Sequence, residues 1–171
     1  MHRRTSVCFF HPNRYRKEPK VGDEIEVFIY KDSQDRLIAT TREPMLQVGQ
    51  TAVLKVKQVT RIGAFLDWGL EKDLLLPYHE QTNRVREGEE CLVALYVDKS
   101  SRLCATMKVY HYLSTRTPYV PGDMVKGRVY EISGNFGVFV AVDDKYSALI
   151  PAREQPANTD RELFLIFVSL R

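Results

Sequence analysis

Short stretches of alternating apolar and polar residues run through this chain, and a period of two is expected of β-strands. From residue 52 onward, Ala52, Leu54 and Val56 alternate with Val53 and Lys55. Similar runs, separated by Gly, Asp and Ser, occupy about residues 64–68, 73–77, 90–97 and 102–107. No stretch keeps a helical period, so the pattern predicts an all-β protein.

Five such strands fall within residues 46–109, with glycines where the chain must bend. Five strands in so short a segment are typical of the small closed barrel called the oligonucleotide-binding (OB) fold. A small SH3-like barrel is the alternative that the same pattern allows.

Two internal repeats indicate that this barrel is one of several tandem modules. Residues 21–41 align without a gap with residues 87–107. Identical pairs include Gly22 and Gly88, Tyr30 and Tyr96, Asp32 and Asp98, and Arg36 and Arg102. In a second repeat, the segment from Val48 aligns with the segment from Val120, so that Phe65 matches Phe139.

The repeats divide each module into a front half and a back half. We expect residues 1–45 to hold the back half of a first module behind a basic N-terminal segment, and residues 46–109 to form a complete module. Residues 110–119 are expected to be a linker, and residues 120–171 the front part of a third module. The first and last barrels would then be incomplete, as in a piece of a longer protein. The run from Arg161 is expected to form the fourth strand of the third module.

The charge of the chain is unevenly distributed. The net charge is +3, but residues 1–20 alone sum to +5, so the remaining residues sum to −2. A role in nucleic-acid binding therefore cannot rest on bulk charge. No apolar run is long enough for a membrane helix or a secretory signal, and the three cysteines form no CxxC pair. We therefore expect a cytoplasmic protein without membrane contact.

The sequence contains no catalytic or metal-binding motif. HExxH, GxSxG and a glycine-rich phosphate loop are absent. His79 and Glu80 are adjacent, and neighbours on a strand point to opposite faces, so they make poor acid–base partners. We expect them to belong to a polar loop after the third strand. Cys91 and Cys104 occupy repeat positions that hold isoleucine in the first module, which indicates core positions. We expect a non-enzymatic protein without a cofactor, metal or small-molecule substrate.

Outward-facing phenylalanines are the main candidates for a binding surface. In residues 64–68 and 138–142 the more aliphatic strand face is the expected core, which leaves Phe65 and Phe139 on the outer face. Stacked RNA bases would cover such rings, at roughly 1–3 kcal/mol per base. Packing against a neighbouring module or loop is an equally good explanation.

Two predicted hairpins carry an Asp and an Arg four residues apart, namely Asp32 with Arg36 and Asp98 with Arg102. Each Asp can cap its turn through hydrogen bonds from the backbone. Each Arg could then reach a phosphate with its permanent charge, although a solvated cation explains it as well.

These features resemble the ribosomal S1-type RNA-binding domain. That family has an aromatic residue followed by Gly, a small residue, Phe and Val, and residues 136–140 match this pattern. The resemblance implies an RNA-binding face that contains Phe65, Phe136, Phe139, Asp98 and Arg102.

Two departures from the S1 pattern bear on the strength of binding. Ile62 replaces the first aromatic residue in the middle module, and Pro77 and Pro151 stand where the family has His. The departures imply either weak binding per module or a changed use of the face.

Residues 20–155 resemble, more specifically, the bacterial conserved virulence factor B family. The stretch GAFLDWGLEKDLLLPYHEQ (63–81), together with residues 21–41, carries this resemblance. The family combines tandem S1-type modules with a winged-helix domain, and we expect residues 1–171 to contain only the modules. Membership implies RNA binding and a regulatory role in gene expression.

Together these observations predict a protein that binds single-stranded RNA. Its aromatic residues would stack on bases, while Arg36, Arg102, Lys55 and Lys57 would contact phosphates. The alternative is a protein–protein interaction scaffold in which the same rings pack against a partner. Salt dependence separates the two, because phosphate contacts weaken steeply as salt rises.

Overall fold

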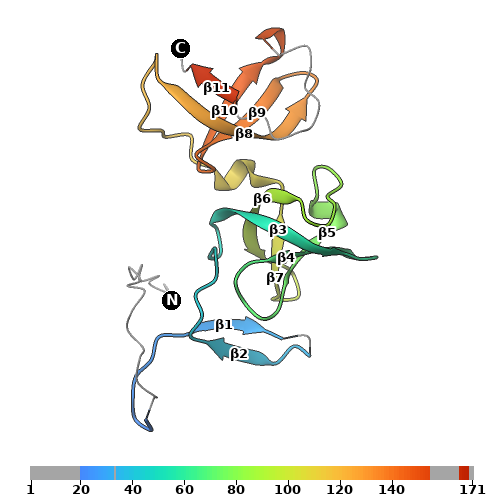
Figure 1. Cartoon of the computed structure of the whole chain (residues 1–171), viewed down its shortest axis with the longest axis vertical. Coiled ribbons are helices and arrows are strands. Elements are labelled where there is room, and N and C mark those ends of the chain that lie inside the picture. Colours follow the sequence, from blue (N-terminus) through green and yellow to red (C-terminus); the bar gives the residue numbers. More distant parts are fainter. Residues whose placement is uncertain (1–19, 33, 155–165, 170–171) are drawn as a thin grey trace.

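The computed structural model describes residues 20–32, 34–154 and 166–169, the last of these as a backbone strand. Three β-units follow one another along the longest axis of the molecule (Figure 1). A two-stranded sheet lies at one end, a closed barrel in the middle and a four-stranded sheet at the other end. The predicted all-β tandem architecture is confirmed. Cys8 and most of the basic N-terminal segment lie outside the described residues.

The middle unit is a five-stranded closed barrel. Its strands are β3 (Thr51–Val59), β4 (Gly63–Asp67), β5 (Leu74–Pro77), β6 (Glu90–Val97) and β7 (Leu103–Thr106). Their order is β3-β4-β5-β7-β6, and β6 pairs with β3 to close the barrel. β7 lies antiparallel to β6 and parallel to β5. This arrangement is the OB-type barrel that the sequence predicts.

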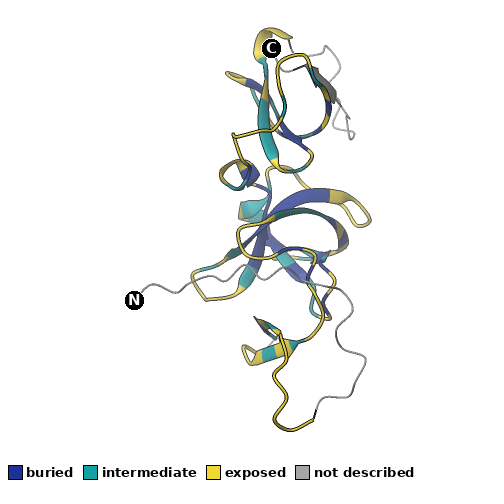
Figure 2. Ribbon diagram, turned by 90° about the vertical axis from the view of Figure 1, so that its left-hand side faces the viewer, coloured by how far each residue is buried: buried dark blue, intermediate teal, exposed yellow. Residues whose placement is uncertain are grey.

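The alternating pattern of these strands builds the barrel interior. Leu54 and Val56 of β3, Leu66 of β4, Leu76 of β5 and Leu95 of β6 are almost fully buried. Figure 2 shows how buried positions gather in the middle unit. Each buried aliphatic side chain of this size stabilises the fold by roughly 1.5–3 kcal/mol. A bulge after Val56 shifts the register of β3 against β4, and such bulges bend a strand as closure of a barrel requires.

The two-stranded sheet repeats the last two strands of the barrel. It consists of β1 (Phe28–Lys31) and β2 (Leu37–Thr40), which pair antiparallel at positions matching β6 and β7 in the sequence repeat. One face packs onto the barrel, where the rings of Phe28 and Tyr30 meet Trp68 edge-on at centroid distances of 5.8 and 6.3 Å. The aromatic contact therefore joins the first module to the second.

The first module corrects one prediction, about the residue Ile25 just before β1. Cys91 is buried, as its exchange with isoleucine predicts, but its counterpart Ile25 is 41% exposed. Ile29 and Leu37, on the face of the two-stranded sheet that is turned away from Trp68, are also exposed. Cys91 faces a closed barrel, whereas the described part of the first module is a two-stranded sheet without strands opposite that face.

The third unit repeats the first four strands of the barrel. It contains β8 (Met124–Ser133), β9 (Gly137–Val142), β10 (Tyr146–Pro151) and β11 (Ile166–Ser169), in the order β10-β9-β8-β11. The equivalent order in the barrel is β5-β4-β3-β6. β11 pairs antiparallel with β8, so the run after Arg161 does contain the expected fourth strand.

The segment after the barrel is packed against both neighbouring units. It begins with the 3-10 helix η2 (Val109–Tyr112), and Val109 and Leu113 are buried in a cluster that joins the outer face of β6 to the third unit. Further on, the Ser114 carbonyl accepts a hydrogen bond from the Ser147 N–H at 2.9 Å. The connection is therefore an ordered contact between the two units.

Two further 3-10 turns occupy matching places in the repeat. They are η1 (Tyr78–Glu80) after β5 and η3 (Ala152–Glu154) after β10. Among the residues that the structure describes, no helix is long and apolar enough to span a membrane.

Candidate nucleic-acid interface

A groove of about 340 Å³ lies where the third unit meets η2. Its volume is at the lower end of the roughly 300–1,000 Å³ typical of small-molecule sites. The residues that line it are Lys108, Tyr110, His111, Glu131, Ser133, Phe136 and Phe139. Two of the predicted RNA-binding residues, Phe136 and Phe139, therefore share one groove.

The two phenylalanines differ in how far the protein covers them. Phe136, in the turn between β8 and β9, is 64% exposed, so its ring is accessible for stacking. Phe139 is half-buried, with ring centroids 5.9 Å from Tyr110 and 6.0 Å from Tyr130. Tyr110 of η2 therefore covers part of the Phe139 ring, which the sequence predicts to face outward.

Charged groups of both signs line the same groove. Lys108 Nζ donates to the His79 carbonyl at 2.6 Å and lies 3.7 Å from the Glu80 carboxylate. Glu131 is exposed on β8 and stands opposite Phe139 in the strand register. The groove thus combines aromatic surface with a cation and a hydrogen-bond acceptor.

The predicted turn caps form in both hairpins. The Asp32 carboxylate accepts hydrogen bonds from the backbone N–H groups of the second and fourth residues after it, at 2.8 and 3.0 Å. Asp98 does the same in its own turn, at 2.8 and 2.9 Å. The aspartates of the repeat therefore hold the turns, as the sequence indicates.

Both hairpin arginines already contact carboxylates. Arg36 lies 2.7 Å from Asp32, and Arg102 donates two hydrogen bonds of 2.7 and 2.9 Å to Asp35 of the first hairpin. The hydrogen bond from Arg102 lowers the pKa of Asp35, and the same bond raises the pKa of Arg102. A phosphate that binds Arg102 would have to displace the Asp35 carboxylate, and would thereby break an ionic contact between the first and second modules.

Lys55 and Lys57 face solvent on β3 but stand among carboxylates. Lys57 Nζ donates to Asp73 at 2.8 Å and lies 3.7 Å from Asp67. The hydrogen bond to Asp73 raises the pKa of Lys57. Lys55 lies opposite Asp67 and Glu90 in the strand register. These neighbours weaken the attraction of the two lysines for phosphate.

Phe65 belongs to a different surface, on β4 of the barrel. It is half-buried and stands opposite Gln58 and Leu75 in the strand register. Ile62, which replaces the first aromatic residue of the S1 pattern, is 61% exposed. At this one position the middle module therefore presents an aliphatic side chain where the third module presents the ring of Phe136.

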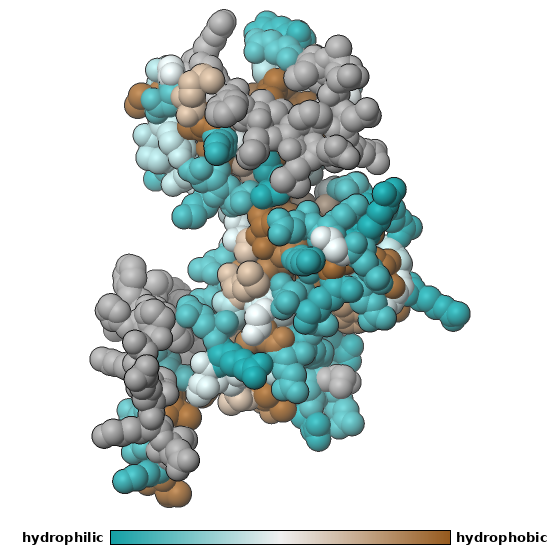
Figure 3. Space-filling view, in the orientation of Figure 1, coloured by the Kyte–Doolittle hydropathy of each residue, from teal (hydrophilic) through white to brown (hydrophobic). Residues whose placement is uncertain are grey.

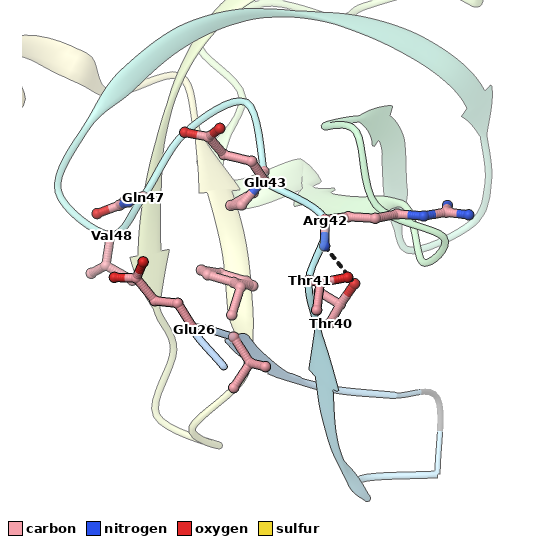
Figure 4. Close-up of a pocket in the computed structure, with 10 residues that line it drawn as sticks. Glu26, Thr40, Thr41, Arg42, Glu43, Gln47 and Val48 are labelled. Atoms are coloured by element: carbon pink, nitrogen blue, oxygen red, sulfur yellow. Dashed lines mark hydrogen bonds between the residues drawn. The ribbon is translucent and has the colours of Figure 1, made fainter. Parts of the chain in front are cut away.

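Another hollow of about 340 Å³ lies beside the first sheet. Glu26 and Glu43 line it, and the Arg42 side chain extends away from Glu26, Gln47 and Val48 (Figure 4). Because carboxylates repel phosphate, this hollow suits RNA less well than the aromatic groove. The described surface on the face seen in Figure 3 is mostly hydrophilic, with small apolar patches.

The His79–Glu80 pair lies in a polar turn after the third strand of the barrel, as predicted, and only the argument from opposite strand faces fails. Both residues lie in the 3-10 turn η1, not on a strand, so their side chains approach to 3.5 Å instead of pointing apart. Glu80 also accepts a hydrogen bond of 2.7 Å from the Thr106 hydroxyl, which ties the turn to β7. These contacts give Glu80 a structural role at the end of the barrel.

The two described cysteines, Cys91 and Cys104, are buried. Burial raises the pKa of the Cys91 thiol to about 12 and that of Cys104 to about 11, so both thiols stay protonated at neutral pH. No cluster of His, Cys, Asp and Glu within residues 20–32 and 34–154 could hold a metal ion.

Sequence reasoning missed five residues of the groove, Lys108, Tyr110, His111, Glu131 and Ser133. The prolines and the missing period of residues 110–122 indicate a linker, and the sequence pattern gives no sign of which surface a linker contacts. The available signal was the aromatic run YHY at 110–112.

Matches to known domains cover most of the chain. Residues 5–42 and 48–108 match the S1 domain. The chain belongs to the S1 domain family. Residues 120–164 match the S1 RNA binding domain, and this part of the chain includes Phe136 and Phe139.

Relatives of this S1-domain chain extend the similarity. It is 29% identical over 159 residues to the uncharacterized protein YitL of Bacillus subtilis, covering 87% of the chain and 53% of the relative. It is 26% identical over 150 residues to conserved virulence factor B of Staphylococcus aureus, covering 82% and 50% respectively. The predicted resemblance is confirmed, and the chain spans about half the length of these curated relatives.

A solved structure supports the tandem fold of the chain. It is the crystal structure of a multidomain protein with nucleic acid binding domains from Streptococcus pneumoniae. The TM-score is 0.55 at 22% sequence identity, and the match covers 82% of this chain and 53% of the other. At this level of identity the likeness concerns the fold alone.

Proposed function

We propose that this chain is a non-enzymatic protein that binds single-stranded RNA and acts in the regulation of gene expression. The observation that carries the proposal is the exposed Phe136 ring beside Phe139, within the segment that matches the S1 RNA binding domain. Unpaired bases can stack on such rings, whereas bases in a duplex are already stacked on each other. The regulatory part rests on relatives named conserved virulence factor B.

The remaining predicted residues, on the barrel and on the hairpin of the first sheet, would make weaker contacts with RNA. Phe65 offers one half-buried ring, and Asp98 holds the turn that carries Arg102. Arg102, like Arg36, Lys55 and Lys57, would exchange a carboxylate neighbour for a phosphate. Because that exchange only replaces one ionic partner by another, we expect the groove of the third unit to dominate affinity.

The test is the affinity of the Phe136→Ala variant for a labelled single-stranded RNA, measured by fluorescence anisotropy at two salt concentrations. Loss of one stacking ring should raise Kd by roughly 5- to 150-fold, which corresponds to roughly 1–3 kcal/mol. Ile132→Ala, which removes an exposed apolar side chain of the neighbouring strand β8, is the matched control and should leave Kd unchanged. A folded Phe136→Ala protein with unaltered Kd would remove the groove from the proposal.

A protein-interaction scaffold is a second candidate, favoured by the exposed Ile29 and Leu37 on the first sheet. These side chains form an apolar face that a protein partner would cover. Such contacts respond weakly to salt, whereas RNA binding should weaken as salt rises. A labelled RNA duplex and a DNA strand of matched sequence are titrated in the same way. Weaker binding of both than of the single-stranded RNA is expected if the protein is specific for single-stranded RNA.

A further inference from the structure

We infer that the segment after the barrel supplies one side of a nucleotide subsite in the groove of the third unit. Tyr110 provides a second aromatic wall there, and Glu131 accepts hydrogen bonds from the bound base. The inference rests on the proposed RNA-binding function and adds to it residues that the S1 pattern does not include.

The argument for a second wall starts from the position of Tyr110. Its ring meets Phe139 edge-on at 5.9 Å between centroids, yet it remains 47% exposed. Phe136 contributes an exposed ring to the same groove. Rings from two segments therefore leave accessible aromatic surface around one cavity, which is the arrangement that holds an unpaired base.

The backbone that carries Tyr110 is already ordered in the protein without RNA. Tyr110 lies in η2, between the buried residues Val109 and Leu113, and the Leu113 N–H donates to the Val109 carbonyl at 3.2 Å. Since these contacts already order the backbone, RNA binding loses little conformational entropy in this segment. A flexible linker would not offer that advantage.

The segment also brings an imidazole to the groove. His111 lines the cavity and contacts the Tyr110 ring at 5.4 Å between centroids. The third module itself has Pro151 where the S1 pattern has His. The neighbouring segment thus supplies a side chain type that the module lacks.

Glu131 indicates which class of base the groove takes. An ionised carboxylate only accepts hydrogen bonds, and Glu131 is exposed beside Phe139. Guanine presents two adjacent donors, N1–H and N2–H, on its Watson–Crick edge. Uracil presents one donor between two carbonyl oxygens, which a carboxylate repels. We therefore expect guanine to be preferred over uracil.

The experiment compares Tyr110→Leu with Tyr119→Leu in the full chain. Tyr119 is a matched control, because it belongs to the same connecting segment and meets a ring of the third unit, Tyr146, edge-on at 6.1 Å, outside the groove. The probes are a labelled oligouridylate and the same strand with one central guanosine. Thermal unfolding of each variant reports its stability.

We expect Tyr110→Leu to weaken binding of the guanosine strand about fivefold or more, and Tyr119→Leu to change it less than twofold. Tyr110→Phe should bind like the parent protein, because it keeps the ring. Glu131→Gln, on an exposed strand position, should reduce the preference for the guanosine strand without altering stability. This second variant tests the inference even where Tyr110→Leu perturbs packing.

Other results would overturn the inference in distinguishable ways. Weak binding by Phe136→Ala together with normal binding by Tyr110→Leu would leave the proposed function standing and remove the second wall. An equal gain in affinity for both strands in Glu131→Gln would mean that the carboxylate only repels phosphate. Failure of the parent protein to bind either strand would defeat the proposed function itself.

Discussion

Glycines at the start of the ring-bearing strands control the local geometry of both modules. Gly137 begins β9 with φ +124°, and Gly63 begins β4 with φ +152°. Side chains rarely adopt such backbone angles, and a Cβ on Gly137 would clash with the Ile150 carbonyl oxygen. The glycine therefore permits the close pairing of β9 with β10 next to Phe136.

We predict that Gly137→Ala destabilises the third unit by about 2 kcal/mol or more, because both backbone strain and a backbone clash oppose the methyl group. Urea unfolding measures the change. Gly134→Ala in the same turn is the control, since a Cβ there would meet nothing within 4 Å. Equal stability of the two variants would contradict the role given to the backbone angle.

Between elements, aromatic contacts decide whether the first sheet stays on the barrel. A two-stranded sheet is marginally stable alone in water, so β1 and β2 depend on packing against Trp68. Trp68 is the single tryptophan of the chain and is 2% exposed. Its fluorescence therefore reports directly on this contact.

We expect Phe28→Ala to shift the emission of Trp68 to longer wavelength, because water reaches the indole when the ring beside it is removed. Leu37→Ala, on the exposed face of the same sheet, should leave the emission unchanged. An unshifted spectrum in Phe28→Ala would mean that the sheet does not shield Trp68 in solution.

For the whole molecule, charge placement governs how RNA affinity responds to salt. Residues 1–20 sum to +5, while Arg36, Arg102 and Lys57 are all engaged by carboxylates. Long-range attraction of RNA should therefore come mainly from the N-terminal cations. The groove should supply base contacts that respond less to salt.

We predict that replacing Arg3, Arg4, Arg14 and Arg16 by Gln lowers affinity for RNA and for single-stranded DNA alike. The slope of log K against log salt should become shallower by about 0.7 for each phosphate that the protein no longer neutralises. Lys57→Gln serves as the control and should change the slope little, because its charge is already compensated. A comparable change of slope per charge in Lys57→Gln would contradict the prediction that the N-terminal cations supply most of the salt-dependent attraction.

The sequence by itself determined the strands, the repeats and the turn caps. Strand alternation depends on residues two positions apart, and the Asp32 and Asp98 caps bind backbone within four residues. Interactions between residues so close along the chain leave a recognisable pattern in the local sequence. For this reason the barrel and its buried leucines could be predicted.

Only the tertiary structure decided which surfaces remain available. Arg102 binds Asp35, 67 residues away, and the partners of Phe139 include Tyr110 from the segment before the third unit. Ile25 keeps a core-like residue type yet is exposed. Such outcomes depend on how one module packs against the next, and residues that touch across modules share no period or spacing in the sequence.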